Sequence, residues 1–307
     1  MNRFLGIEIG GTKLQIVAGD ETATISERLR FSISPTAGAK GIRQQIETGL
    51  AALLEKTKVA AIGVGFGGPV DWQTGEICCS HQIPGWSEFP IAQWLESLSA
   101  VPVFVDNDAN VAALGEAIHG AGAGCNPVFY VTLGSGVGGG MVVDQKIYHG
   151  AKPGESEIGH VRLDKTGTIV ESRCSGWAVD KRVRAVVGEH PGCALSQLIG
   201  SAAGNEARFL KAALDQNDSI ARRIVDETAD DLAFGLSHVT HLFHPEKIIL
   251  GGGLSLIGEP LRAAVGGSLS RYVMEAFTPR PQVVLSQLGE DAVTIGALEL
   301  ARSRSLK

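Results

Sequence analysis

Asp106, Asn107 and Asp108 stand in a row directly after the apolar stretch VPVFV. Phosphoryl transfer from a nucleotide to an alcohol needs a carboxylate that accepts the hydroxyl proton, in-line positioning and neutralisation of charge. Asp108 is our candidate for that general base, and Asn107 for a hydrogen-bonding partner of the acceptor. Asp and Asn residues also cap helix N-termini, but three capping residues in a row exceed what one helix requires. We therefore expect capping and catalysis to coexist here.

Two glycine-rich turns each lie between two apolar, β-prone runs. They are GGTK in LGIEIGGTKLQIV and GSGVGGG in FYVTLGSGVGGGMVV. Successive backbone N–H groups in a tight turn form a small anion-binding nest, to which Thr12, Thr132 and Lys13 add hydroxyls and a positive charge. One copy fits an ordinary hairpin equally well, but the pair, together with GGGLS between a predicted strand and a predicted helix, favours phosphate loops. The predicted phosphate-binding residues are Gly10, Gly11, Thr12, Lys13, Thr132, Gly134, Ser135, Gly136, Gly252 and Gly253.

Other phosphate and nucleophile motifs are excluded. The sequence contains no G-x-x-x-x-G-K-[ST], no G-x-S-x-G and no H-E-x-x-H. Gly134, Gly136 and Gly139 do match G-x-G-x-x-G. However, a dinucleotide-binding fold requires a helix after this pattern, and MVVDQKIY is typical of a strand.

Two further short motifs could contact a polyol. Glu157 and His160, in ESEIGH, are three residues apart and could bind neighbouring hydroxyls, although a surface turn with incidental polar residues gives the same pattern. Gly67 and Gly68, in FGGPVD, either allow close approach of a ligand or mark a sharp exit from a strand. We expect Trp86, in IPGW, to pack in the core rather than to stack on a ligand.

The composition is that of a globular protein that binds neither nucleic acid nor a membrane. The chain has 307 residues, a formal net charge of −6 and no basic run that would form a nucleic-acid surface. No apolar run reaches the length of a membrane span, and a strand is predicted at once after the N-terminus. Five cysteines without C-x-x-C spacing fit free thiols in a reducing compartment. These observations predict a cytoplasmic protein.

Hydrophobic periodicity predicts alternating strands and helices. Strands are predicted at 3–9, 14–18, 59–65, 101–105, 127–133, 141–143, 247–250 and 282–285. Helices are predicted at 40–57, 90–99, 108–119, 219–243, 258–275 and 291–303, and the region between 144 and 218 is predicted to be rich in loops.

The two strand–glycine turn–strand segments open the two halves of the chain, which indicates a duplicated domain. We expect an α/β fold with an N-terminal domain at 1–118 and a C-terminal domain at 119–290. The helix at about 291–307 is expected to pack back on the N-terminal domain.

GIEIGGTK, FVDNDAN, TLGSGVGGG, ESEIGH and ILGGG, in this order and spacing, resemble the motifs of the ROK family of sugar kinases. The resemblance extends from about residue 3 to residue 303, and the five motifs are specific only in combination. It implies two duplicated actin-like ATPase domains (ribonuclease H-like) around a cleft, with Mg-ATP between the two glycine turns and a hexose beside it. It also implies a homodimer.

The resemblance assigns roles to individual residues. Asp108 corresponds to the general base, and Glu8 corresponds to the family's usual Asp, which holds Mg²⁺ through a water. The implied sugar contacts are Gly67, Gly68, Asn107, Asp108, Glu157 and His160.

The sequence departs from the family after His160. Many members carry a cysteine cluster there that binds a structural zinc with the histidine, whereas VRLDKTGTIVESRCSGWAVDK contains only Cys174. Four ligands are needed to close such a site, so we predict no zinc and expect packing, involving Trp177, to hold this region. Counting from Cys174 places Gly176 where the family has a sugar-contacting glutamate, and Glu171 is a possible substitute. Gln82 replaces the usual asparagine before the PGW turn.

These features predict an ATP-dependent kinase that acts on the 6-hydroxyl of an aldohexose, with glucose as the first choice and an N-acetylhexosamine (N-acetylmannosamine or N-acetylglucosamine) as the second. The alternative to an enzyme is a non-catalytic regulator that binds a sugar. Repressors of the family carry a DNA-binding segment before the first glycine turn, and only Met1, Asn2 and Arg3 precede the first strand here. Polyphosphate in place of ATP remains open as the donor.

Overall fold

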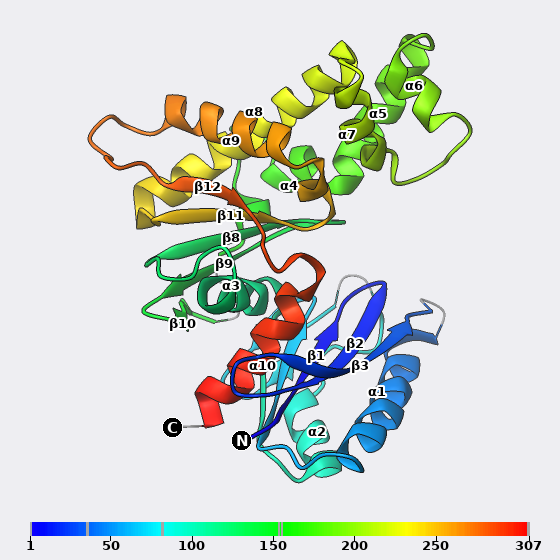
Figure 1. The fold of residues 1–307 in the computed structure, drawn as a ribbon, viewed down its shortest axis with the longest axis vertical. Coiled ribbons are helices and arrows are strands. Elements are labelled where there is room, and N and C mark those ends of the chain that lie inside the picture. The colour runs from blue at the N-terminus through cyan, green and yellow to red at the C-terminus, as the bar shows by residue number, and fades with distance from the viewer. Residues whose placement is uncertain (1, 35–36, 81–82, 153, 155, 306–307) are drawn as a thin grey trace. The chain divides into compact units, whose positions relative to one another are not determined.

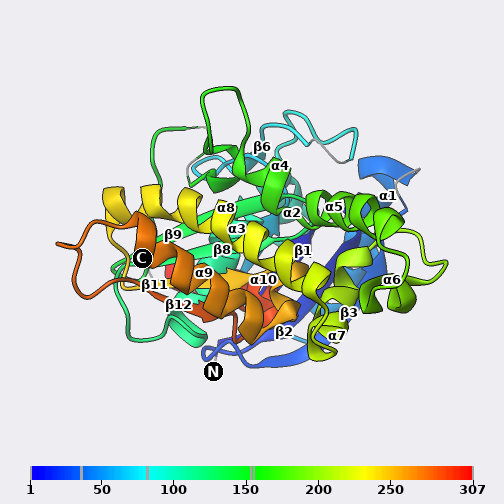
Figure 2. The same cartoon turned by 90° about the horizontal axis from the view of Figure 1, so that it is seen from above.

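The computed structural model describes residues 2–34, 37–80, 83–152, 154 and 156–305, and it folds into two compact units. Unit 1 comprises Met1–Gly124, Gly140–Glu155 and Glu290–Lys307. Unit 2 comprises Cys125–Gly139 and Ser156–Gly289. Figures 1 and 2 show the same ribbon from two directions, with a sheet and covering helices in each unit. The fold is therefore α/β, as predicted.

The sheet of unit 1 has the strand order β3-β2-β1-β4-β7. β1, β4 and β7 run parallel, and β2 pairs antiparallel with both β1 and β3. The strands are β1 (Phe4–Ile9), β2 (Lys13–Gly19), β3 (Ile25–Ser32), β4 (Ala61–Phe66) and β7 (Val103–Asn107). Ile9 pairs with Phe66, and Phe66 pairs with Asn107, so the three parallel strands end at one edge of the sheet. The residues that follow these strand ends are thereby brought together.

Alternation along β1 gives this sheet two different faces. Leu5, Ile7 and Ile9 are buried in one core with α1 (Gly38–Leu54) and α2 (Ile91–Ser99). On the other face a Cβ at Gly63 would collide with the carbonyl oxygen of Ala297 in α10 (Ala292–Ser305). Glycine at this position lets α10 pack directly on the strand backbone.

Helix α3 (Asp108–His119) starts directly at the end of β7 and is buried over most of its length. It packs against α10, where a Cβ at Gly296 would meet the carbonyl oxygen of Val111. The first turn of α3, which carries the candidate base, is thus fixed between a sheet edge and a second buried helix.

The second sheet has the strand order β10-β9-β8-β11-β12, and the division between the units falls within β9. β8, β11 and β12 run parallel, whereas β10 is antiparallel to β9. The strands are β8 (Val128–Leu133), β9 (Val137–Val143), β10 (Lys146–Ile147), β11 (Lys247–Gly251) and β12 (Gln282–Leu285). A short antiparallel pair of unit 1 is formed by β5 (Val70–Asp71) and β6 (Glu76–Ile77).

In unit 2 the long helix α8 (Ser219–Phe243) packs along α9 (Glu259–Tyr272), and α9 covers β12. Both views show α8 and α9 side by side (Figures 1 and 2). The remaining helical segments are η2 (Ile158–His160), α4 (Val170–Cys174), α5 (Gly176–Glu189), α6 (Ala194–Ile199), η3 (Glu206–Phe209), α7 (Leu210–Asp215), η4 (Gly253–Ile257) and, at the junction with unit 1, η5 (Gly289–Asp291).

The predicted strands and long helices are confirmed with shifts of their ends, and Trp86 is buried as predicted. The largest shift is at β9, which begins at Val137, inside the predicted glycine turn, rather than at residue 141. β3 and the helices α4 to α7 were not predicted. The helix predicted at 258–275 is α9, and a 3₁₀ turn, η4, lies between it and the end of β11. In the part of the chain that the structure describes, no helix is both long and apolar enough to cross a membrane. The predicted domain boundary at 118/119 stays a prediction, and the compact unit 1 also includes Gly140–Glu155.

Candidate active site

The first glycine turn joins β1 to β2 at the edge where the parallel strands of unit 1 end. The backbone N–H of Gly10 donates to the carbonyl oxygen of Lys13 at 3.0 Å, which closes the turn. The side chain of Thr12 is exposed. The turn therefore has the tight, open geometry expected of an anion-binding loop.

Glu8 lies just before this turn and is almost completely buried, with 6% of its surface exposed. Its Oε1 is 3.0 Å from Nζ of Lys13, and its Oε2 accepts a hydrogen bond from Nε2 of Gln15 at 2.7 Å. Burial raises the pKa of Glu8, and the ammonium of Lys13 partly opposes that increase. The predicted magnesium-binding acid and the predicted phosphate-binding lysine are thus paired with each other.

Gln15 in turn is fixed by two arginines of β3. Nη1 of Arg28 and Nε of Arg30 each donate to Oε1 of Gln15 at 2.9 Å. Because Oε1 accepts from both arginines, the amide nitrogen of Gln15 is turned toward Glu8. The orientation of the Glu8 carboxylate is therefore determined by three neighbouring strands.

Gly67 and Gly68 follow β4 at the same edge. The N–H of Gly67 donates to the carbonyl oxygen of Ile9 at 2.9 Å, which places the two turns side by side. A Cβ built on Gly67 would lie 3.3 Å from Oδ2 of Asp108. A small hollow opens here, and it is lined by Ile9, Gly10, Gly11, Phe66, Gly67, Ser80 and Ile83.

Asn107 and Asp108 occupy the junction of β7 and α3. Asn107 is the N-cap of α3, since its Oδ1 accepts from the N–H groups of Ala109 and Asn110, and its Nδ2 donates to the carbonyl oxygen of Gly68 at 3.2 Å. The expected capping is confirmed. Asp108 is the first residue of the helix, where its half-buried carboxylate is stabilised by the helix dipole.

The second glycine turn lies in unit 2 between β8 and β9. It is closed by the N–H of Gly134, which donates to the carbonyl oxygen of Gly136 at 3.0 Å, and Ser135 is exposed. A Cβ on Gly252 would lie 2.6 Å from the backbone nitrogen of Leu133. The turn after β11 therefore packs directly against the end of β8, which brings Gly252 and Gly253 to the predicted phosphate residues Thr132 to Gly136.

Glu157 precedes the 3₁₀ turn η2 and His160 is its last residue, and both side chains are exposed. The buried residues between them, Ile158 and Gly159, hold the turn against unit 2, and a Cβ on Gly159 would collide with the carbonyl oxygen of Val137. Both polar side chains are therefore free of the core and available to a ligand.

Comparison with known proteins identifies the family. The model of the ROK family matches residues 4–304.

The chain belongs to the ROK family.

It is 31% identical to the glucokinase of Halalkalibacterium halodurans, over 95% of this chain and 93% of that protein. It is 28% identical to the glucokinase of Thermotoga maritima, over 98% of both chains. Among solved structures, a ROK family glucokinase from Streptomyces griseus, in complex with glucose and AMPPNP, is 32% identical, with a TM-score of 0.86 over 98% of this chain and all of that chain. The two α/β units therefore have the actin-like ATPase fold of ROK sugar kinases.

Glu171, named above as a possible substitute for the missing glutamate, lies beside the second glycine turn. Gly176, placed by counting at the position of a sugar-contacting glutamate of ROK proteins, begins α5 and donates its N–H to the carbonyl oxygen of Gly134 at 2.7 Å. Glu171 instead carries the carboxylate at this turn, because its Oε2 accepts from the N–H of Val137 at 2.9 Å. Gln82, the other substituted position, lies outside the described residues.

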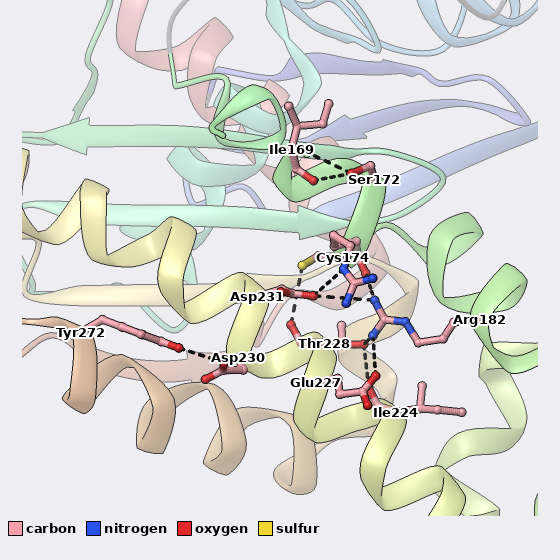
Figure 3. A network of polar contacts seen from close by, with 11 residues as sticks. Ile169, Ser172, Cys174, Arg182, Ile224, Glu227, Thr228, Asp230, Asp231 and Tyr272 are labelled. Carbon is pink, nitrogen blue, oxygen red and sulfur yellow. Dashed lines mark hydrogen bonds and ion pairs between the residues drawn. The ribbon is translucent and has the colours of Figure 1, made fainter. Parts of the chain in front are cut away.

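The segment that holds the zinc cluster in many ROK proteins is joined to α8 by ion pairs (Figure 3). Nε of Arg173 donates to Oδ2 of Asp231 at 2.8 Å, and Nη2 of Arg182 lies 3.7 Å from the same oxygen. Nη1 of Arg182 also donates to the hydroxyl of Thr228 at 3.0 Å. The expected role of Trp177 was wrong, since this side chain is 66% exposed.

Cys174 is buried in the same joint and donates its thiol to the carbonyl oxygen of Thr228 at 3.6 Å (Figure 3). Burial raises the pKa of Cys174 to about 12. A neutral, buried thiol is a poor metal ligand, because zinc binds the thiolate. Within the described ranges, no three His, Cys, Asp or Glu side chains gather as a possible ligand set. The absence of zinc stays a prediction.

Proposed function

We propose that this protein is an ATP-dependent kinase that phosphorylates the 6-hydroxyl of an aldohexose, with glucose as the first choice. The observation that carries the proposal is the position of the Asp108 carboxylate, at the first turn of α3 and against Gly67, on the sheet edge that also bears the first glycine turn. A sugar hydroxyl that enters over Gly67 can hydrogen-bond to this carboxylate. The similarity to glucokinases supports the choice of acceptor.

In this proposal Asp108 accepts the proton of the 6-hydroxyl as the oxygen attacks the γ-phosphate of ATP, and ADP leaves. Gly67 and Gly68 allow the sugar to approach the backbone, and Asn107 adds a polar contact. Glu157 and His160 of unit 2 bind other sugar hydroxyls, with Glu171 as an additional acid from the same unit.

The phosphate groups are assigned to the two glycine turns, Gly10–Lys13 and Thr132–Gly136, and to Gly252 and Gly253. Glu8 would hold Mg²⁺ through a water, and the ion, when bound, neutralises phosphate charge. Glu8 fits this role because its carboxylate lies directly before the first turn and is held in one orientation by Gln15. Lys13 would exchange its ion pair with Glu8 for the bound phosphate.

The test is ADP production from Mg-ATP with a panel of hexoses, amino sugars and N-acetylated sugars, repeated with polyphosphate as donor. Wild-type protein is expected to turn over glucose, and Asp108→Asn should lower kcat by about 10²- to 10⁴-fold. Glu259→Gln is the matched control, since Glu259 also lies in the first turn of a helix but pairs only with Arg262 on the surface. Full activity of Asp108→Asn would refute the assignment of the base.

Absence of turnover with every sugar and donor, in protein that still binds a sugar, would favour the regulator instead. Binding is measured by calorimetry with the same panel, so that an inactive preparation is distinguished from a protein that binds without catalysis.

A further inference from the structure

Asp106 directly precedes Asn107 and Asp108, and it is 3% exposed. Its Oδ1 accepts hydrogen bonds from the backbone N–H of Asn107 at 2.9 Å and from Nδ2 of Asn110 at 3.0 Å. One carboxylate oxygen thus holds both the residue before Asp108 and the residue one half-turn after it. Asp106 therefore fixes the first turn of α3 through these two hydrogen bonds.

The other oxygen of Asp106 is bound by a histidine from a distant part of unit 1. Nε2 of His149 lies 2.7 Å from Oδ2 of Asp106, and the two side chains are only 7% and 4% exposed. A carboxylate can only accept hydrogen bonds, so Nε2 of His149 carries the proton and donates. His149 was not among the residues predicted to act at the site.

The imidazole of His149 is itself held in place. It stacks on the indole of Trp72, with ring centroids 4.1 Å apart and planes inclined by 16°, and the guanidinium of Arg304 lies 5.2 Å from the centroid of the Trp72 ring. A second contact fixes the same segment, because Nζ of Lys152 pairs with Oδ2 of Asp71 at 2.6 Å. His149 is therefore docked on the turn that follows β5 with one ring orientation.

We propose that His149 is a positioning residue, which fixes Asn107 and Asp108 through Asp106 for the reaction of the proposed function, on which this inference rests. Without the donor from His149, Oδ2 of Asp106 would be buried and unpaired, which is costly for a carboxylate. The side chain of Asp106 would then turn toward water or another donor and release Asn107 and Asn110. A small displacement of a general base lowers the rate strongly.

Two variants separate the hydrogen bond from the stacking. His149→Gln keeps an N–H donor at about the position of Nε2 but loses the ring, and His149→Phe keeps a ring that can stack on Trp72 but has no donor. We expect His149→Gln to retain kcat within about threefold and His149→Phe to lower kcat by about 10- to 100-fold, with KM for ATP within about twofold. Equal effects of the two variants, or the reverse ranking, would overturn the proposal.

His119→Phe is the matched control. Nε2 of His119 also binds a buried carboxylate of unit 1, that of Glu299, at 3.0 Å, but Glu299 is additionally paired with Arg302 and lies away from the strand ends. The kcat of His119→Phe should equal that of the wild-type protein. A loss as large as that of His149→Phe would mean that any broken histidine–carboxylate pair in unit 1 impairs the enzyme, which contradicts a specific role of His149.

Hydrogen exchange of the unliganded protein tests the same inference without activity. In His149→Phe the amides of Asn107 to Asn110 should exchange about tenfold faster than in wild type, whereas in His149→Gln they should exchange at nearly the wild-type rate. Peptides from β1 and β2 serve as an internal reference. If the wild-type protein phosphorylates no sugar, the proposed function is wrong. The role of His149 is rejected separately, if the amides of Asn107 to Asn110 exchange in His149→Phe at the wild-type rate.

Discussion

Glu8 is the residue where stability and the proposed activity oppose each other. Its carboxylate is buried, and its raised pKa means that the folded state disfavours the charged form. Lys13 offsets part of this cost through its ion pair, but Lys13 is itself 43% exposed and free to leave. If Lys13 is to bind phosphate, its ion pair with Glu8 must be weak enough to break. The pair therefore offsets only part of the cost of burying the Glu8 carboxylate.

Replacing Glu8 by Gln is therefore expected to stabilise the protein and to reduce its activity. Between the ordinary pKa of a glutamate and the raised pKa of Glu8, the folded state binds more protons than the unfolded state, so stability falls as pH rises through that window. Glu8→Gln removes this dependence and should raise the free energy of unfolding at pH 7 by about 1 kcal/mol. The gain should shrink toward pH 4, as measured by denaturant titrations across this range.

Lys13→Met gives the opposite control, because it leaves Glu8 buried without its cation. This variant should be less stable than wild type at pH 7 and approach it at low pH. If Glu8→Gln is less stable than wild type at every pH, the ion pair with Lys13 stabilises the folded state by more than the burial of Glu8 costs.

At the residue scale, the sequence identified the polar residues of the site but not always their positions. Asp108, Gly67 and the first glycine turn could be grouped because each follows a parallel strand, and strand ends are readable from the sequence. Glu171 could be named only as a possible substitute, because counting from Cys174 places Gly176 rather than an acid at the family's position. His149 could not be found, because its contact with Asp106 is a side-chain pairing between distant segments that no local pattern encodes.

At the scale of elements, ion pairs join α4 and α5 to α8. Asp231 accepts from Arg173, on α4, and lies close to Arg182, on α5, whose side chain is only 13% exposed (Figure 3). Arg182 also lies 3.9 Å from Glu227 and donates to Thr228. Partly buried, hydrogen-bonded charge pairs of this kind contribute more than exposed pairs do.

We predict that Asp231→Asn lowers the free energy of unfolding by about 1–3 kcal/mol, since it weakens two arginine contacts and leaves Arg182 partly buried. The matched control is Asp215→Asn, at an exposed pair with Lys211, where the loss should stay below about 0.5 kcal/mol. Thermal melting of both variants, with and without a zinc chelator, provides the measurement. Similar losses in both variants, or a large drop in melting temperature with the chelator, would contradict this account of the joint.

Element prediction failed where the local signal was weak. β3 has the sequence ISERLRFS, in which charged residues interrupt the apolar alternation, and its pairing with β2 is determined by tertiary structure. α4, α6 and α7 are five or six residues long, too short for a helical period to be recognised. By contrast, α8 is long and strongly periodic, and its predicted range of 219–243 agrees with the observed Ser219–Phe243.

At the scale of the whole molecule, each unit has its own sheet and core, but unit 1 is assembled from three separate stretches of chain. Leu298 of α10 is 1% exposed and packs in a core with Phe4 and Val17 of unit 1. Leu261 of α9 is fully buried in unit 2. These two leucines provide equivalent perturbations of the two units.

Leu298→Ala and Leu261→Ala should each lower the free energy of unfolding by about 2–5 kcal/mol. The first variant should destabilise unit 1, and the second should destabilise unit 2. We expect hydrogen exchange to accelerate in β1, β2 and α3 for the first variant and in α8 and β12 for the second. The measurement is native-state exchange followed by mass spectrometry. Acceleration throughout the chain in both variants would show that the units unfold as one cooperative structure rather than separately.

The duplicated design could be predicted because each half opens with the same strand–turn–strand pattern. The inclusion of Gly140–Glu155 in unit 1 could not, since β10 and the segment of His149 are attached to α3 and β5 by contacts between distant residues. The homodimer remains a prediction, because it concerns a surface for which the sequence carries no pattern.

The return of α10 to unit 1 has a consequence for the order in which the protein is made. β1, β4 and β7 leave the ribosome early, but the face of their sheet that bears Gly63 is covered by a helix that is synthesised after all of unit 2. Until then the part of this face that α10 covers is exposed to water. Unit 2, although later in the sequence, has all of its helices available before unit 1 is complete, so the second half of the molecule is positioned to fold first.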